Sequence, residues 1–319
     1  MLETRRMLFL HVPKTAGTSF RIGAVRRLGA KRCAFDYGRA SDVTSPMVKK
    51  HMYEDPDPLE LSRELERAGV VMLGGHFALR RFSPLLGCAN AVAFCRRPED
   101  QMMAHYQHFL RHNGYQGTLS EFLEGPFGAG SQTRFFDGYP LEAIGFIGVT
   151  ERYAESLRLI EHDFGVCVPH LAVNKNPKVR DTGSYEVPAE FAEQYRQAAM
   201  MDAELYVRAN ALLDVRVAML DTGQPYVHGA IQAASRTHVQ GFAFHAQTDA
   251  AVTVMLCVND DVRAEYVATD DRPGLRGIRA PRNAFVGFNF HIKGMVKPGD
   301  RISVRVASTH QQLGCMTLD

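Results

Sequence analysis

Residues 7–20, MLFLHVPKTAGTSF, join an apolar run to a loop of small residues, and this stretch constrains the fold more than any other part of the chain. Residues 7–12 are almost all apolar, which is typical of a strand covered on both faces in a parallel sheet. Pro13 lacks the backbone N–H that a sheet ladder needs, so the strand should end there. We therefore predict a buried strand, a tight loop and a helix over residues 19–28.

The loop after this strand has the composition of an anion-binding site. Lys14 supplies a mobile positive charge. The residues after it all have small side chains: Thr15, Ala16, Gly17, Thr18 and Ser19. Successive backbone N–H groups and the N-terminus of the next helix can then face one anionic group. The loop is not a Walker A sequence, because that motif has its lysine after the second glycine, whereas Lys14 precedes Gly17. A strand, a glycine loop and a helix can also form an ordinary corner of an α/β fold.

Three more apolar runs end in polar residues, and this pattern indicates a parallel sheet. The runs are residues 70–73 before G-G-H-F, residues 91–95 before R-R-P and a helix over 99–112, and residues 144–149 before a helix that runs to about 164. Repeated units of strand, polar end and helix imply parallel strands with right-handed crossovers. Such sheets bind ligands at the carboxyl ends of their strands. We expect Lys14, His76 and Arg96 at one edge of the sheet, with the turn-rich residues 31–58 as an excursion that contributes to an acceptor cleft.

The pattern changes after a long helical segment at residues 188–213. From about residue 222 the chain has short alternating or apolar runs separated by turn signals and without helices. These runs are residues 239–245, 251–258, 264–268, 284–292 and 301–307. Closely spaced strands of this kind favour a small antiparallel β-sandwich. The expected domains are residues 1–221, an α/β domain with a P-loop-like parallel sheet flanked by helices, and residues 222–319, an all-β accessory domain.

Composition excludes some classes of function. The chain has 319 residues, of which 45% are hydrophobic and 23% charged, as in ordinary globular proteins. A net charge of +2 is too small for bulk attraction to nucleic acid or to a membrane. No apolar run has the length of a transmembrane span or a signal sequence. The six cysteines lack CxxC or zinc-type spacing, so we expect reduced thiols and no metal site.

The order P-K-T-A-G-T-S at residues 13–19 resembles the 5′-phosphosulfate loop of sulfotransferases that use 3′-phosphoadenylyl sulfate (PAPS). Within that family it is most similar to the branch of heparan-sulfate 2-O-sulfotransferases and related bacterial enzymes. The resemblance covers about residues 7–165. It implies the sulfotransferase version of the P-loop fold, PAPS as donor, adenosine 3′,5′-bisphosphate as product and no obligatory metal. Residues 14–19 would then bind the 5′-phosphosulfate. Animal Golgi members carry a membrane anchor, so we expect a cytoplasmic, bacterial protein.

His76 is the predicted catalytic base. Sulfuryl transfer needs a group that takes the proton of an acceptor hydroxyl, and a near-neutral histidine suits this role. The G-H-F sequence around His76 resembles the position of the catalytic histidine in the family. Lys14 is the second predicted catalytic residue, because its charge can stabilise the leaving bridging oxygen. A histidine at a strand end can also be purely structural.

Arg96 is the predicted ligand of the donor's 3′-phosphate. Its planar guanidinium can bind a phosphate through two hydrogen bonds. The segment that begins at Arg96 resembles the family's R-D-P motif, which has a serine eight residues after the arginine. Here Arg97 replaces the aspartate and Ala104 replaces the serine. The lost hydroxyl removes a phosphate contact of about 1 to 2 kcal/mol, for which Arg97 could compensate.

Further positions are predicted on looser resemblances. S-Q-T-R-F-F-D-G at residues 131–138 resembles a family segment near the acceptor and the donor, which makes Gln132 and Arg134 candidate substrate contacts. His105 and His108 are interpreted as packing residues, since no acidic or cysteine partner accompanies them. Thr150, Glu151 and Arg152 match the family's G-x-T-E-R stretch and are interpreted as structural. A basic loop with Asn174, Lys175, Lys178 and Arg180 is a weaker candidate for contacts to the donor.

The predicted function is transfer of a sulfuryl group from PAPS to a hydroxyl group of an acceptor, a carbohydrate or glycoconjugate. A nucleotide-dependent small-molecule kinase is an alternative, but the position of Lys14 and the lack of a Mg²⁺ carboxylate after a buried strand oppose it. A non-catalytic glycan-binding protein with a decayed sulfotransferase fold is a second alternative, which the missing hydroxyl at Ala104 leaves open. The tail resembles β-modules of bacterial carbohydrate-active enzymes at Gly241-Phe242-Ala243. The oligomeric state has no signal in the sequence.

Overall fold

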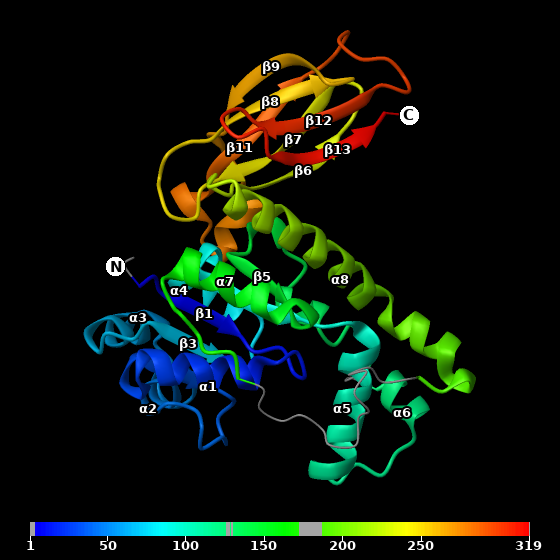
Figure 1. The fold of residues 1–319 in the computed structure, drawn as a ribbon. Coiled ribbons are helices and arrows are strands. Elements are labelled where there is room, and N and C mark those ends of the chain that lie inside the picture. Colours follow the sequence, from blue (N-terminus) through cyan, green and yellow to red (C-terminus); the bar gives the residue numbers. More distant parts are fainter. Residues whose placement is uncertain (1–3, 126–127, 129, 172–186, 319) are drawn as a thin grey trace.

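The computed structural model describes residues 4–125, 128, 130–171 and 187–318, and the other residues are a grey trace in Figure 1. The first part of the chain is a parallel sheet flanked by helices, and the second part is a pair of antiparallel sheets at one end of it (Figure 1). This arrangement confirms the predicted fold class. In the described part of the chain, no helix is long and apolar enough to cross a membrane.

Five parallel strands form the first sheet, in the order β2-β3-β1-β4-β5. They are β1 (Met7–Leu10), β2 (Cys33–Asp36), β3 (Met72–Gly75), β4 (Ala91–Cys95) and β5 (Phe146–Val149). The central strand β1 pairs with β3 on one side and with β4 on the other. Every residue of β1, β3, β4 and β5 is buried, which explains why these segments are continuous apolar runs. Their carboxyl ends lie along one edge, as predicted.

The edge strand β2 corrects the expectation for residues 31–58. Cys33 to Asp36 do not leave the sheet but pair with β3, in a register that joins Cys33 to Met72 and Asp36 to Gly75. Only four residues form this strand, and neighbouring strands rather than local sequence preference decide whether so short a segment is extended. The rest of the segment contains α2 (Pro46–Lys49) and a π-helical turn at Lys50–Glu54.

Helices flank the sheet, and one of them spans much of the molecule. Besides α2, the shorter α-helices of the described chain are α1 (Gly17–Leu28), α3 (Pro58–Arg67), α4 (Ser83–Leu86), α5 (Pro98–His112), α6 (Leu119–Glu124) and α7 (Tyr153–Phe164). The 30-residue helix α8 (Ala192–Asp221) runs from beside α6 to the sandwich (Figure 1). Its buried Leu205, Ala209 and Leu213 belong to the core of the parallel sheet. α8 extends eight residues beyond the predicted helix end at 213, because its apolar positions continue along β5.

The second part is a β-sandwich of two four-stranded antiparallel sheets, ordered β10-β11-β7-β6 and β13-β12-β8-β9. The strands are β6 (His228–Ala234), β7 (His238–Phe244), β8 (Thr253–Val258), β9 (Asp261–Val267), β10 (Asp270–Asp271), β11 (Phe285–His291), β12 (Arg301–Val306) and β13 (Gln312–Thr317). The five predicted runs correspond to β7, β8, β9, β11 and β12. The sequence did not indicate β6, β10 or β13, whose residues are largely polar, small or half-exposed.

The sandwich shares a core with the parallel sheet. Between β10 and β11 the chain forms two 3₁₀ turns, Pro273–Ile278 and Pro281–Ala284, and their buried Leu275 and Ile278 pack in the same apolar cluster as β1. A buried arginine adds a polar link: Arg216 of α8 donates to the carbonyl of Gly145 at 2.6 Å and stacks on Tyr226, 3.9 Å from the ring centre. The two parts are therefore joined by a continuous buried interface.

Candidate active site

The loop between β1 and α1 has a backbone that its residue types alone do not favour. Lys14 and Ala16 adopt left-handed conformations with φ of 65° and 64°. Such a conformation costs a non-glycine residue roughly 1 kcal/mol or more, so surrounding contacts must hold it. One of these contacts is internal: the buried Thr15 hydroxyl donates to the carbonyl of Val12 at 2.9 Å. The loop is thus fixed in a tight curl before α1 begins at Gly17.

The curl leaves several backbone donors without acceptors. Among the described residues, the N–H groups of Thr15, Ala16, Gly17 and Thr18 donate to no acceptor. The first turn of α1 contains no acidic residue, and no side chain caps the helix. Unsatisfied N–H groups at a helix N-terminus carry partial positive charge and bind anions. The geometry therefore supports the anion-binding function expected for residues 14–19.

Gly17 is required here by close packing against His11. A Cβ atom at position 17 would lie 2.6 Å from Nε2 of His11 and still closer to its Cδ2. The His11 side chain is buried, and its Nδ1 lies 2.6 Å from the hydroxyl of Tyr37. Burial, with a smaller contribution from the nearby charges of His76, Arg21 and Lys14, lowers the pKa of His11 to about 2. His11 is therefore neutral at physiological pH, and its ring packs against the loop at Gly17. The sequence did not indicate this role, because His11 lies within an apolar run.

His76 lies directly after β3, beside His11. Its Nδ1 is 2.6 Å from the carbonyl oxygen of His11. A carbonyl oxygen can only accept, so Nδ1 donates the hydrogen, and in the neutral ring Nε2 keeps its lone pair. Desolvation lowers the pKa of His76, the hydrogen bond to His11 opposes this, and the charges of Arg21 and Lys14 lower it further. His76 is exposed to solvent and neutral at pH 7, as a general base must be.

Arg96 follows β4 and is held next to the loop. Its backbone N–H donates to Oε1 of Gln132 at 2.9 Å, and Nε2 of Gln132 donates back to the Arg96 carbonyl at 2.9 Å. Its guanidinium reaches toward the loop, with Nη1 3.4 Å from the carbonyl of Lys14. Gln132 is fully buried and uses both ends of its amide on Arg96. The geometry gives Gln132 a role in positioning Arg96, and the substrate contact expected for Gln132 from the sequence stays a prediction.

Asp202 of α8 organises the segment that holds Arg96, and no signal in the sequence pointed to it. This fully buried carboxylate accepts from the backbone N–H groups of Gln132 and Thr133 and from the Thr133 hydroxyl, at 2.7 to 3.2 Å. It also lies 3.2 Å from the hydroxyl of Ser131, which is 2.7 Å from Oε1 of Gln101. Gln101 in turn donates to the carbonyl of Pro13 at 3.0 Å. A buried polar network therefore connects α8 to the loop.

The space in front of the loop is cationic. Desolvation, followed by the charge of Arg111, lowers the pKa of Lys14. Burial lowers the pKa of His105 to about 4, and the charges of Arg134 and Lys14 contribute. Desolvation and the charge of Lys14 also lower the pKa of His108. With these lowered pKa values His105 and His108 are neutral at physiological pH, so the positive charge near the loop comes from Lys14, Arg111 and Arg134, and an anionic ligand would stabilise it.

A pocket of about 510 Å³ opens beside His76. Tyr37 and Tyr53 line it together with two ion pairs: Arg81 donates to the buried Asp36 at 2.8 Å, and Arg80 lies 3.5 Å from Asp137 at the rim. Asp36 also accepts from the hydroxyl of Tyr53 at 2.6 Å. The charges of the pocket wall are therefore balanced, in contrast to the cationic space in front of the loop. The pocket therefore combines the aromatic rings of Tyr37 and Tyr53 with hydrogen-bonding groups, and it lies next to Nε2 of His76.

The remaining predicted positions either contact other residues of the protein or lie outside the described residues. Thr150 donates to the carbonyl of Cys95 at 2.9 Å and joins the ends of β5 and β4. Glu151 accepts from the N–H of Arg97, and Arg152 pairs with Glu155, so residues 151 and 152 bind other partners and not each other. Asn174, Lys175, Lys178 and Arg180 lie outside the described residues. No group of three or more potential metal ligands is found within the described ranges.

Comparisons with known proteins show a structural likeness to a solved structure. No protein-family model matches the chain, and no curated protein matches it. The crystal structure of a sulfotransferase from Alicyclobacillus acidocaldarius is similar, with a TM-score of 0.35 and 15% sequence identity. The match covers 64% of this chain and 96% of that one.

Proposed function

We propose that this chain transfers the sulfuryl group of PAPS to a hydroxyl group of a carbohydrate or glycoconjugate. The observation that carries the proposal is the position of His76, a neutral histidine with a free Nε2, between a cationic loop of unsatisfied N–H groups and a charge-balanced pocket. An anionic donor and an uncharged acceptor could meet at this nitrogen. The likeness of P-K-T-A-G-T-S to a phosphosulfate loop identifies the donor in the proposal.

The donor would occupy the cationic space. The N–H groups of residues 15–19 and the side chain of Lys14 would bind the 5′-phosphosulfate, and Arg96 would bind the 3′-phosphate. Arg97, which could compensate for the hydroxyl missing at Ala104, is exposed, and its guanidinium lies 3.7 Å from Asp100. Arg111 of α5 shares the electrostatic environment of Lys14 and offers an additional positive group, and the neutral His108 on the same helix offers a hydrogen-bonding one.

The reaction follows from this placement. Nε2 of His76 takes the proton of the acceptor hydroxyl while the hydroxyl oxygen bonds to sulfur. The bond from sulfur to the bridging oxygen breaks, and adenosine 3′,5′-bisphosphate leaves with the electron pair. Lys14 and the loop N–H groups stabilise the charge that grows on the bridging oxygen. As in phosphoryl transfer, positioning and electrostatics supply most of the catalysis. No step calls for a metal.

The acceptor would bind in the pocket beside His76. Because Asp36 is paired with Arg81 and Asp137 with Arg80, the pocket has no excess charge to select a strongly anionic acceptor. The faces of Tyr37 and Tyr53 and the polar groups around them suit a neutral sugar. Arg134 is exposed at the edge of the cationic space and remains a proposed substrate contact. We assign catalysis to residues 1–221 and propose that the β-sandwich of residues 222–319 is an accessory domain that binds carbohydrate.

A kinase would need carboxylates for Mg²⁺ near the loop. Three described carboxylates beside the site are buried. Asp36 and Asp202 are each occupied by several hydrogen bonds within the protein, and Asp100 lies 3.7 Å from the guanidinium of Arg97. This favours the sulfotransferase over the kinase. A non-catalytic glycan-binding protein would not need a histidine with a lowered pKa and a free Nε2 beside the loop, although it is the alternative that an assay must exclude.

The test measures transfer of ³⁵S from labelled PAPS to a panel of neutral sugars, glycans and cell extracts by the full chain. We expect transfer to at least one acceptor, and both His76→Ala and Lys14→Ala should lower turnover by about a hundredfold or more. The matched control is His162→Ala, which removes an exposed histidine at the far end of α7. Glycan binding without transfer would contradict the proposal, and so would thermal stabilisation by ATP and Mg²⁺ but not by adenosine 3′,5′-bisphosphate.

A further inference from the structure

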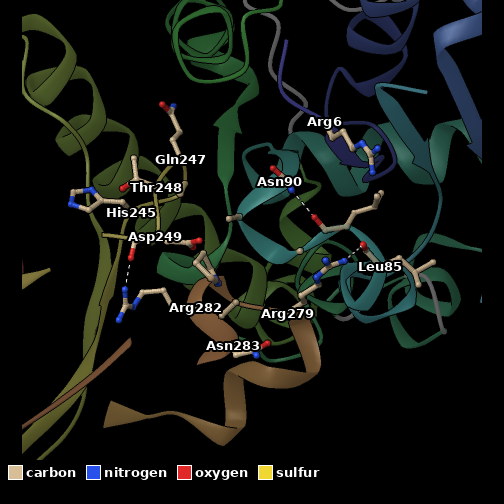
Figure 2. A pocket seen from close by; sticks show the side chains of 16 residues that line it. Arg6, Leu85, Asn90, His245, Gln247, Thr248, Asp249, Arg279, Arg282 and Asn283 are labelled. Atoms are coloured by element: carbon tan, nitrogen blue, oxygen red, sulfur yellow. Dashed lines mark hydrogen bonds between the residues drawn. The ribbon is translucent and has the colours of Figure 1, made fainter. Parts of the chain in front are cut away.

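Two histidines meet on the sandwich, at the end of β7 that lies away from the parallel-sheet domain. β7 begins at His238 and ends at Phe244, and His245, which follows it, lines a pocket of about 500 Å³ between the sandwich and that domain (Figure 2). The strand from His238 to Phe244 spans about 20 Å. His238 and its partner His291, at the end of β11, are therefore at the outer end of this sheet, and neither lines the pocket beside His76.

Strand register brings His238 and His291 together. The two residues are partners in the antiparallel pairing of β7 with β11. Beside them the backbone N–H of Ile292 donates to the carbonyl of Thr237 at 2.8 Å, so positions 238 and 291 are a non-hydrogen-bonded pair, in which facing side chains come closest. The ring centres of the two histidines are 4.4 Å apart. Val239, the next residue of β7, is buried in the sandwich core, so both histidines are on the outer face of the sheet.

Both rings have a nitrogen atom available for a ligand. Nδ1 of His238 lies 2.9 Å from the hydroxyl oxygen of Thr237, which orients the ring and leaves Nε2 without a partner among the described residues. His291 is exposed and forms no hydrogen bond or ion pair with any residue in the described part of the chain. Histidines that bind metal ions commonly use their second ring nitrogen in a hydrogen bond, as His238 does with Thr237.

The spacing of the rings suits a single metal ion between them. Zinc binds imidazole nitrogen at about 2.1 Å, and two rings on one tetrahedral ion then have centres about 5 Å apart. The observed 4.4 Å is close to this separation, and small rotations of two side chains on a solvated face can close the difference. No group of three or more histidine, cysteine or acidic side chains gathers within the described ranges, so water would complete the coordination.

The chemistry of the ligands narrows the choice of ion and of site. Imidazole nitrogen suits Zn²⁺, Ni²⁺ and Cu²⁺, whereas Mg²⁺ and Ca²⁺ take oxygen ligands. Another histidine pair, His108 and His112 of α5, has ring centres 4.8 Å apart. Desolvation and then the charge of Lys14 lower the pKa of His108, and the same charge would repel a metal cation. The pair on the sandwich is therefore the better candidate.

We propose that His238 and His291 form a binding site for one divalent transition-metal ion that prefers nitrogen ligands, Zn²⁺, Ni²⁺ or Cu²⁺. Nε2 of His238 and a ring nitrogen of His291 bind the ion, and water molecules fill its remaining positions. The ion joins β7 to β11 on the outer face of the sandwich, so its binding stabilises the folded chain. The site is independent of sulfuryl transfer, because it shares no residue with the loop at 14–19 or with His76.

The test is calorimetric titration of the untagged full chain with ZnCl₂, NiCl₂ and CuCl₂ at pH 7.5, together with thermal unfolding in the presence and absence of each ion. We expect saturable binding and a higher Tm with the ion. His238→Gln and His291→Gln should each weaken binding about tenfold or more, because a single histidine cannot chelate the ion. Excess MgCl₂ should not compete, and competition by Mg²⁺ would contradict ligation by nitrogen.

The matched control is His112→Gln, which breaks the histidine pair of α5 and leaves the sandwich unchanged. This variant should bind the ion as the wild type does. Binding that both sandwich variants retain, binding that His112→Gln abolishes, or no saturable binding of any of the three ions up to about 1 mM would overturn the proposal. Both sandwich histidines are on a solvated face, so without metal their variants should unfold at the wild-type temperature. If one variant fails to fold, the other still decides the outcome.

Discussion

The Nδ1 atom of His76 lies 2.6 Å from the carbonyl oxygen of His11, and this hydrogen bond decides which nitrogen of His76 can act as a base. It is a consequence of strand register: Leu10 and Gly75 are partners in the pairing of β1 with β3, so the residues that follow them emerge together at the sheet edge. The bond orients the ring, and Nε2 is left to face the reacting groups.

The first prediction concerns pH. His76 must be neutral to accept a proton, and its pKa is lowered, so activity should be retained below pH 6.5 and lost only as the pH falls through the lowered pKa. Arg21→Gln removes a positive charge that lowers this pKa and should move the acid limb of kcat/KM to higher pH. Arg26→Gln, an exposed change on the same helix, is the control. An acid limb that does not move would show that another group is titrating.

The second prediction concerns the contact between Gly17 and His11. Gly17→Ala places a methyl group against the His11 ring, and overpacking of this kind costs about 1 to 3 kcal/mol. Urea unfolding should show this loss of stability, together with reduced donor binding. Gly274→Ala adds a methyl group where nothing lies within 4 Å and should have little effect. Equal stability of the two variants would mean that the loop relaxes freely around His11.

The third prediction concerns Asp202. Asp202→Asn replaces one acceptor oxygen with an N–H group facing the donors of residues 131–133, and the loss of charge-assisted hydrogen bonds should destabilise the chain by about 2 to 3 kcal/mol. Because the same segment holds Arg96, affinity for adenosine 3′,5′-bisphosphate should fall as well. Glu204→Gln, an exposed change two residues along α8, serves as the control. Unchanged affinity in Asp202→Asn would separate Asp202 from the donor site.

The fourth prediction concerns stability in acid. His11 has a pKa near 2 in the folded chain and an ordinary value of 6.5, so below pH 6.5 the unfolded chain binds a proton that the folded chain does not. Between pH 6 and 4 this histidine should therefore lower the free energy of unfolding by about 1.4 kcal/mol for each unit of falling pH. In His11→Gln that component should be absent, whereas the exposed change His162→Gln should keep it. Parallel pH profiles for wild type and His11→Gln would contradict the burial of a neutral His11.

Part of the fold was predictable because its signals are local. The apolar run before Pro13 and the small residues after Lys14 identified β1, the loop and α1, and the parallel arrangement placed His76 and Arg96 at the same edge. The short strand at Cys33–Asp36 escaped prediction, since its pairing with β3 and not its own four residues makes it extended.

The supporting contacts of the site could not be predicted, because they join distant residues. Asp202 is about 70 positions from the segment it holds, and Tyr37 is 26 positions from His11. Contacts between residues so far apart along the chain produce no periodic pattern in the sequence. The left-handed backbone conformation of Lys14 and Ala16 could not be predicted either, because glycine is the residue that usually indicates it.

The most direct test of the central claim is a crystal structure of the full chain with adenosine 3′,5′-bisphosphate. The account predicts the 5′-phosphate within hydrogen-bond distance of the N–H groups of residues 15–18 and of the Lys14 side chain, and the 3′-phosphate at Arg96. A nucleotide bound elsewhere, or a loop whose N–H groups face away from the phosphate, would contradict it.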